Sequence, residues 1–121
     1  VDEADNFLKL GFSSIRKILK EGREFGVGTI LSTQFLKHFD TQQDDFSKYI
    51  LSWIVHKVDD LSPKDVKNLF NTDNKAAEDE LFSSIKKLSK HHSFVKLGDS
   101  ATPFYIKDRA FWEILEENGA Q

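Results

Sequence analysis

The spacing of apolar residues predicts several amphipathic helices along this chain. Residues 7–24 place apolar side chains at three- and four-residue steps with basic side chains opposite, which is typical of a helix packed on one face. Ser62 followed by Pro63 is a good helix start, because serine caps and proline suits the first turn. The predicted helices span residues 7–24, 43–51, 63–70 and 75–91, and a last one begins after a cap at Asp108.

Short apolar runs between these helices predict strands. Residues 27–33 form a β-branched run that does not alternate cleanly with polar residues, which is typical of a strand covered on both faces, and residues 53–58 predict a second strand. Residues 94–97 and 104–107 predict a hairpin with a wide loop. The alternation of helix and strand therefore predicts an α/β fold, with a mainly parallel sheet flanked by helices and an antiparallel C-terminal hairpin.

Composition restricts the class of protein. The 121 residues, 39% of them hydrophobic and 31% charged, fit one globular domain over residues 1–121. The net charge of −3 excludes a histone-like binder that acts through bulk charge, and the lack of cysteine excludes disulfides and thiol chemistry. No apolar run approaches the roughly 20 residues of a membrane span, so we expect a cytoplasmic protein.

The amino end of the sequence is unusual. The chain begins with Val1 and contains no methionine, whereas a natural reading frame begins with one. An α/β sheet also begins with a strand, and only three residues, Val1 to Glu3, are left to supply it here. We therefore expect this sequence to be a fragment of a longer protein.

Asp2 and Glu3 are the first candidates for chemistry. Adjacent carboxylates at the end of an apolar strand can serve a nucleotide-bound metal ion, one in the Mg²⁺ shell and the next polarising a water molecule. The alternative is a charged helix start, because acidic side chains there suit the helix dipole.

Gln34 and Arg23 are further candidates. Gln34 follows the predicted strand 27–33, where a neutral amide can contact a γ-phosphate; the alternative is a surface glutamine. Arg23 lies in the stretch 9–24, whose five basic and two acidic residues leave a local charge of +3. The planar guanidinium group of Arg23 suits phosphate; the alternative to a phosphate contact is a solvated helix face.

Other polar clusters carry weaker signals. His91 and His92 favour a polar helix end over a metal site, because no cysteine or His-x-x-x-His spacing accompanies them. Ser32 and Thr33 have no His–Asp partnership that would mark a nucleophile. A nucleic-acid binder is disfavoured by the net charge and the lack of a recognised motif; its candidate residues would be Arg16, Lys17, Lys20 and Lys86–Lys90.

The order of the motifs resembles the HerA/FtsK group of P-loop ATPases. In that group an acidic strand-end motif, Walker B, precedes a helix that ends in Gly-Arg-x-x-Gly-Val and a strand that ends in Thr-Gln. Here Asp2-Glu3, residues 22–27 and residues 33–34 supply these motifs in that order. The resemblance is specific over residues 1–34 and, beyond them, concerns only the layout of strands and helices.

The resemblance implies a role for each matching residue. Asp2 would belong to the carboxylate position associated with Mg²⁺, and Glu3 would be the general base for the attacking water. Gln34 would sense the γ-phosphate. Arg23 would face phosphate in its own subunit or in a neighbour. The implied fold is a partial RecA-like ATPase core.

The resemblance also implies partners and cofactors. The group's translocases are hexameric motors that move double-stranded DNA, and related members act in DNA processing, conjugation and phage defence, including phosphorothioation-dependent restriction. ATP, Mg²⁺, DNA, a homo-oligomeric ring and other subunits are therefore expected of the intact parent. No Gly-x-x-x-x-Gly-Lys-Ser/Thr loop occurs in this sequence, so we expect the isolated fragment to use no cofactor and to hydrolyse no ATP.

The competing interpretation is a self-contained α/β protein-interaction module without nucleotide chemistry. The two interpretations differ in one expectation about geometry. The motor interpretation places Glu3 and Gln34 at one edge of the sheet, together with the carboxyl ends of strands 27–33 and 53–58. Opposite edges for Glu3 and Gln34 would remove its main support.

Overall fold

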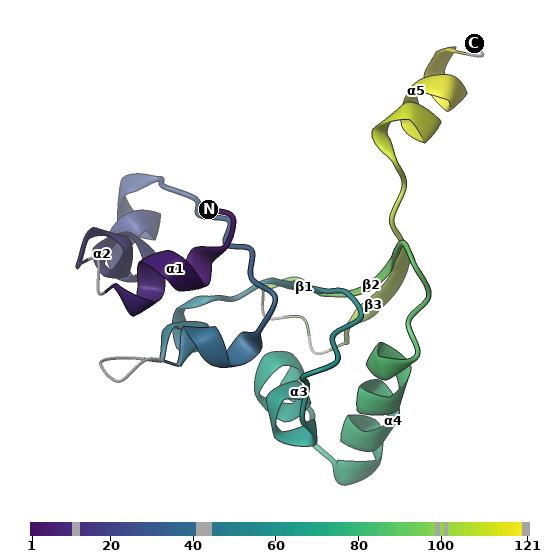
Figure 1. The fold of residues 1–121 in the computed structure, drawn as a ribbon, viewed down its shortest axis with the longest axis horizontal. Helices are drawn as coiled ribbons and strands as arrows, with labels where there is room; N and C mark the ends of the chain where they lie inside the picture. The colour runs from purple at the N-terminus through teal and green to yellow at the C-terminus, as the bar shows by residue number, and fades with distance from the viewer. Residues whose placement is uncertain (11–12, 41–44, 99, 101, 120–121) are drawn as a thin grey trace.

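The computed structural model describes residues 1–119 except residues 11–12, 41–44, 99 and 101. Within the described residues, helices flank a small sheet, and the last helix projects away from it, far from the amino end of the chain (Figure 1). The elements in chain order are α1 (Ala4–Lys9), α2 (Ser13–Glu21), η1 (Gly22–Phe25), η2 (Leu36–Phe39), η3 (Phe46–Tyr49), β1 (Trp53–Val55), α3 (Pro63–Phe70), α4 (Lys75–Lys86), β2 (His92–Lys96), β3 (Phe104–Lys107) and α5 (Phe111–Gly119), the three η elements being short 3-10 helices.

The sheet has three strands in the order β1-β2-β3, and both pairs are antiparallel. The predicted mainly parallel sheet and the partial RecA-like core are therefore wrong. The reason lies in the connection between β1 and β2, which contains two helices, α3 and α4. Each helix reverses the direction of the chain, so β2 returns antiparallel to β1, whereas a parallel pair is joined by a single crossover helix.

The predicted strand over residues 27–33 is also wrong. This segment has no regular secondary structure and joins no sheet, and Ile30 at its centre is 85% exposed. A strand of a parallel sheet needs a covering layer on both faces, and Ile30 has none. The segment instead makes backbone hydrogen bonds with residues 1–4, at the amino end of the chain.

The predicted helix over residues 7–24 is divided into α1, α2 and η1, with residues 11–12 outside the described residues. Gly26 ends η1 with a φ of 69°, as the helix-stop signal predicted. The helix predicted over residues 43–51 begins outside the described residues at 43–44. Its remainder contains only η3, which Asp45 caps by accepting a hydrogen bond from the Ser47 amide at 3.1 Å.

The helix start at Ser62 is confirmed. The Ser62 amide donates to the Asp65 carboxylate at 2.8 Å, and the Asp65 amide donates to the Ser62 hydroxyl at 3.3 Å, which completes a capping box. The antiparallel C-terminal hairpin is confirmed as β2 and β3. The predicted cap at Asp108 is wrong: its carboxylate accepts a hydrogen bond from the Ser93 hydroxyl at 2.8 Å, and α5 begins at Phe111.

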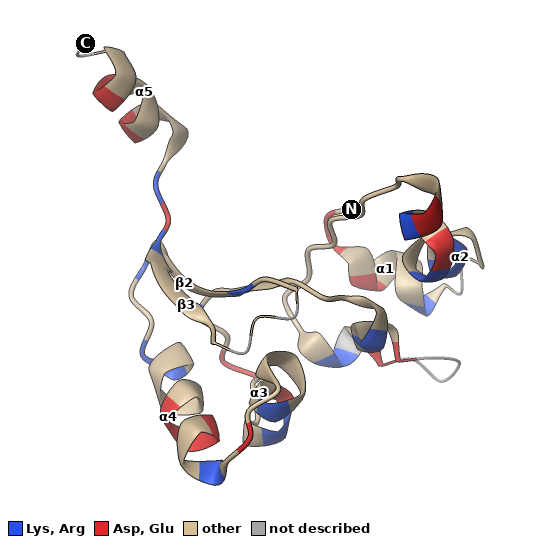
Figure 2. Cartoon of the chain, turned by 180° about the vertical axis from the view of Figure 1, so that it is seen from behind, with Lys and Arg blue, Asp and Glu red and all other residues tan. Residues whose placement is uncertain are grey.

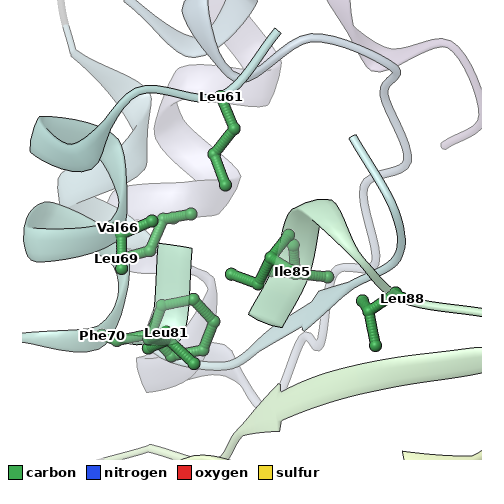
Figure 3. Packing of buried hydrophobic residues seen from close by; sticks show 8 residues of the cluster. Leu61, Val66, Leu69, Phe70, Leu81, Ile85 and Leu88 are labelled. Carbon is green, nitrogen blue, oxygen red and sulfur yellow. The ribbon is translucent and has the colours of Figure 1, made fainter. Parts of the chain in front are cut away.

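The main core lies between α3, α4 and β1 (Figure 3). A second cluster lies among α1, η2 and η3 and contains Leu8, Phe39 and Phe46. Trp53 of β1 packs against both clusters and meets the Phe39 ring edge-on, with ring centroids 5.6 Å apart. The main core consists of Val55, Leu61, Val66, Leu69, Phe70, Leu81, Ile85 and Leu88.

The last helix, α5, projects away from the sheet (Figure 1). Its apolar side chains are largely exposed, with Phe111 at 72%. An ion pair between Arg109 and Glu117, and a hydrogen bond from the Ala110 amide to Glu113 at 2.9 Å, are local contacts of this helix. None of the helices in the described part of the chain combines the length and apolarity needed to cross a bilayer.

Candidate functional site

Asp2 and Glu3 immediately precede α1. Glu3 is the N-cap residue and adopts a left-handed backbone, with φ 48° and ψ 48°. The amide of Glu3 donates to the Asp2 carboxylate at 3.0 Å, and the Glu3 carboxylate accepts from the Asn6 side-chain amide at 3.4 Å. A left-handed backbone costs a residue other than glycine about 1–2 kcal/mol, and such strain concentrates at functional sites.

Backbone hydrogen bonds hold the segment around Ser32 against the amino end of the chain. The Ser32 amide donates to the Val1 carbonyl at 2.9 Å, and the Ala4 amide donates to the Ser32 carbonyl at 2.8 Å. The terminal amine of Val1 donates to the Ile30 carbonyl at 2.5 Å. These bonds bring together two segments that lie about 30 residues apart in the sequence.

Residues from the amino end of the chain and from the segment around Ser32 line an open pocket of about 390 Å³. Gln34 lies at a bend just before η2, and its side chain is exposed. The preceding Thr33 hydroxyl accepts a hydrogen bond from the Phe35 amide at 3.4 Å, which shapes this turn. The pocket is lined by Asp2, Glu3, Asp5, Asn6, Ser32, Thr33, Gln34 and Phe35.

The lining of the pocket is acidic. It includes the carboxylates of Asp2, Glu3 and Asp5 and contains no lysine or arginine. Lys9 lies 3.7 Å from the Asp5 carboxylate, one helical turn further along α1. A pocket with this lining favours a cation over an anion, because each additional carboxylate makes the local electrostatic potential more negative.

The pocket is lined by oxygen donors of the kind that divalent cations bind. Among the residues that the structure describes, no group of three or more His, Asp or Glu side chains is arranged to hold a metal by itself. Mg²⁺ in nucleotide sites is held by one or two carboxylates together with waters and substrate phosphates, so it does not need such a group. Asp2 and Glu3, with the Ser32 and Thr33 hydroxyls, are oxygen donors of the required kind.

The structure brings three of the four predicted site residues together. Asp2, Glu3 and Gln34 line one pocket. Arg23 does not line it; this residue lies in η1 with an exposed side chain. The pocket also includes no residue of β1, so Glu3 and Gln34 meet between loops and α1 and do not meet at an edge of the sheet.

Sequence reasoning missed several residues of the pocket. Asp5 and Asn6 lie in the first turn of α1, directly after the acidic pair, so the sequence does place a third carboxylate close to Asp2 and Glu3. The sequence carries no comparable signal for Ser32, whose position depends on its backbone contacts with Val1 and Ala4.

Comparison of the sequence with protein-family models and with curated proteins finds no match. The motifs and the geometry of the pocket are therefore what supports a functional assignment.

Proposed function

We propose that residues 1–35 supply the carboxylate and amide side of an ATPase site in a DNA-translocating motor of the HerA/FtsK kind, acting in a bacterial DNA-processing or restriction system. One observation supports this proposal most strongly. Glu3 and Gln34, thirty-one positions apart in the sequence, line the same pocket. In the order of motifs the acidic pair Asp2-Glu3 comes first and the pair Thr33-Gln34 comes last. All four residues line this pocket.

Asp2 would hold the magnesium ion together with nucleotide phosphates, which leaves the Glu3 carboxylate to act as the base. The bound ion would neutralise charge on the phosphate oxygens. The acidic lining of the pocket, with no basic side chain among its residues, supports a cation at this position. The hydrogen bond from the Glu3 amide to Asp2 orients the Asp2 carboxylate.

The other roles follow from the side chains. The Glu3 carboxylate would accept a proton from the water that attacks the γ-phosphorus, while the bond to the bridging oxygen breaks to give ADP and phosphate. The Gln34 amide would donate a hydrogen bond to a γ-phosphate oxygen. Arg23, exposed and outside the pocket, suits a site on a neighbouring subunit better than its own.

The phosphate-binding loop must come from elsewhere, because no Gly-x-x-x-x-Gly-Lys-Ser/Thr occurs in these 121 residues. Such a loop supplies backbone amides and a lysine that cradle the phosphates. The chain by itself is therefore expected to release no phosphate from ATP, while its carboxylates still attract a divalent ion that carries a triphosphate.

Paramagnetic Mn²⁺, used in place of Mg²⁺, tests the proposed ion site. With an ¹⁵N-labelled chain, Mn²⁺ and a triphosphate, the amide signals of residues 2–6 and 32–35 should broaden first. The double variant Asp2→Asn, Glu3→Gln should lose this selectivity. Glu116→Gln, an exposed carboxylate of α5 changed in the same way, is the matched control and should keep it.

Two results would reject the proposal. One is broadening confined to other acidic stretches, such as Asp59–Asp60 or the acidic face of α5. The other is an unchanged broadening pattern in the double variant. Release of phosphate from ATP by the chain alone would reject the assignment of the phosphate-binding loop to another part of the motor.

A further inference from the structure

The half of the sheet formed by β2 and β3 carries a cluster of three rings, of which Tyr105 is exposed, while His92 and Phe94 are half-buried and Phe94 packs against the main core. The rings of His92 and Tyr105 are stacked, with centroids 5.4 Å apart and planes 17° from parallel, and Phe94 approaches Tyr105 at 5.5 Å. Tyr105 remains 59% exposed. An exposed aromatic side chain beside a second ring offers a surface on which a further planar ring can stack.

The register of the sheet puts lysines on the same face as these rings. Phe94 pairs with Tyr105, and His92 pairs with Lys107, so these four side chains share one face because directly opposed residues of an antiparallel pair do so. Lys96, two residues after Phe94, belongs to that face as well. The Lys90 carbonyl contacts the His92 ring nitrogen at 3.0 Å, which orients the ring.

This part of the chain is basic although the whole chain is acidic. Residues 86–109 contain six lysine or arginine residues and two aspartates, a local charge of +4 against −3 for all 121 residues. Figure 2 shows the basic residues along the strands and in the segments that join the sheet to α4 and α5.

The carboxylate of Asp108, the residue after Lys107, points away from the aromatic cluster. Asp108 accepts a hydrogen bond from Ser93, and Ser93 lies on the opposite face of β2 from His92 and Phe94. His56 faces the same carboxylate at 3.4 Å. The charge of Asp108 is therefore directed to the other side of the sheet.

We infer that this face of β2 and β3 binds single-stranded nucleic acid, with a base stacked against Tyr105 and His92 and backbone phosphates contacted by Lys96 and Lys107. Aromatic rings on a sheet, flanked by cationic side chains, bind unpaired bases in this way. A duplex keeps its bases stacked inside and cannot use the rings. The inference does not depend on the proposed ATPase site, because it requires neither nucleotide nor metal.

Fluorescence anisotropy with a labelled oligo(dT) of about 12 nucleotides, without ATP or Mg²⁺, tests this surface. The unaltered chain should bind the oligonucleotide, and more tightly than a duplex of equal length. Tyr105→Ile, which keeps a strand-forming residue, should weaken binding about fivefold or more, because base–aromatic stacking contributes at least that much. Tyr105→Phe should retain binding, since the ring is preserved.

Charge variants provide the second comparison. Lys107→Glu should weaken binding and make its salt dependence shallower by roughly one phosphate contact. Lys64→Glu, an exposed lysine of α3 changed in the same way, is the matched control and should bind nearly as the unaltered chain does. Circular dichroism of each variant establishes that the fold is retained.

Several outcomes would overturn the inference. The first two are that oligo(dT) does not bind, or that Tyr105→Ile binds it with the same affinity as the unaltered chain. The other two are that the Lys64 and Lys107 variants lose the same amount of affinity, or that the duplex binds as tightly as oligo(dT). Any of them leaves the Mn²⁺ result at Asp2 and Glu3 unaffected, so the two proposals fail independently.

Discussion

The backbone amide of Ser32 donates a hydrogen bond to the carbonyl oxygen of Val1 at 2.9 Å. The Ser32 carbonyl in turn accepts from the Ala4 amide at 2.8 Å, so a single residue bonds to the chain on both sides of Asp2 and Glu3. Because the contacts use backbone atoms, they hold the pocket together without depending on the serine side chain.

Ser32→Pro should loosen the pocket. Proline has no backbone N–H, so the bond to Val1 is lost, and we expect a loss of about 1 kcal/mol in the free energy of unfolding. Urea titration followed by circular dichroism measures it. Ser32→Ala keeps the N–H and should lie close to the unaltered chain; equal destabilisation by alanine and proline would contradict the role of the backbone bond.

The left-handed backbone of Glu3 predicts an unusual order of stability among variants. Glycine adopts positive φ without steric cost, whereas alanine does not, so Glu3→Gly should be up to about 1 kcal/mol more stable than Glu3→Ala. Inside a helix the order is reversed, because glycine is about 0.5–1 kcal/mol less favourable than alanine there. Thermal unfolding of the two variants measures it, and a more stable alanine variant would show that Glu3 is not strained.

The buried cluster between α3 and α4 predicts where stability resides. Ile85 is 0% exposed, so Ile85→Ala should cost about 2–5 kcal/mol through lost burial and a cavity. Leu115→Ala, a large-to-small change on the exposed α5, should cost roughly 0.5 kcal/mol or less. Urea midpoints of the two variants give the comparison; similar losses would mean that α5 is packed in solution.

The ion pairs of Lys75 should make the free energy of unfolding fall at high pH. The Lys75 ammonium group donates a hydrogen bond to the Glu78 carboxylate at 3.0 Å and lies 3.2 Å from the Asp79 carboxylate. The hydrogen bond to Glu78, and after it the one to Asp79, raise the pKa of Lys75 above its ordinary 10.5. The folded chain therefore binds this proton more tightly than the unfolded chain. The stabilisation is present below pH 10.5 and is lost as the pH rises through the raised pKa.

Lys75→Met isolates that contribution from other groups that titrate at high pH. The difference in urea midpoint between the unaltered chain and this variant should shrink as the pH rises from about 9 to about 12. A difference that stays constant over this range would mean that the ion pairs of Lys75 contribute nothing to folding.

Local signals in the sequence were sufficient for some elements. Ser62 and Pro63 define a helix start in the sequence, and the helix starts there as predicted, with a capping box between Ser62 and Asp65. The β2–β3 hairpin joins neighbouring apolar runs, so its strands need no distant partner. Such elements depend on contacts close in sequence, which a periodic pattern records.

The direction of the sheet could not be read from apolar patterning, because a pattern locates a strand without naming its partner. Residues 53–55 do form a strand, and the pair of helices that follows sets its direction relative to β2. Residues 27–33 have a strand-like composition, yet Ile30 is exposed and no layer covers it. Chain reversals and covering layers are tertiary properties.

The candidate site was predicted in part. Asp2, Glu3 and Gln34 were singled out by their places at the ends of predicted strands and by the order of motifs, and they line one pocket although the predicted parallel sheet does not form. Arg23 was grouped with them and lies outside that pocket. The place of Ser32 depends on backbone hydrogen bonds, which leave no trace in residue type.

The proximity of Glu3 and Gln34 can be measured directly, because the chain contains no cysteine. A nitroxide attached to Gln34→Cys, an exposed position, should broaden the amide signals of residues 2–6 strongly in an ¹⁵N spectrum. The same label at Lys64→Cys is the control for nonspecific broadening. Selective broadening of residues 2–6 by the label at position 34 is the expected result, and unchanged signals there would show that the carboxylates and the amide do not form one site.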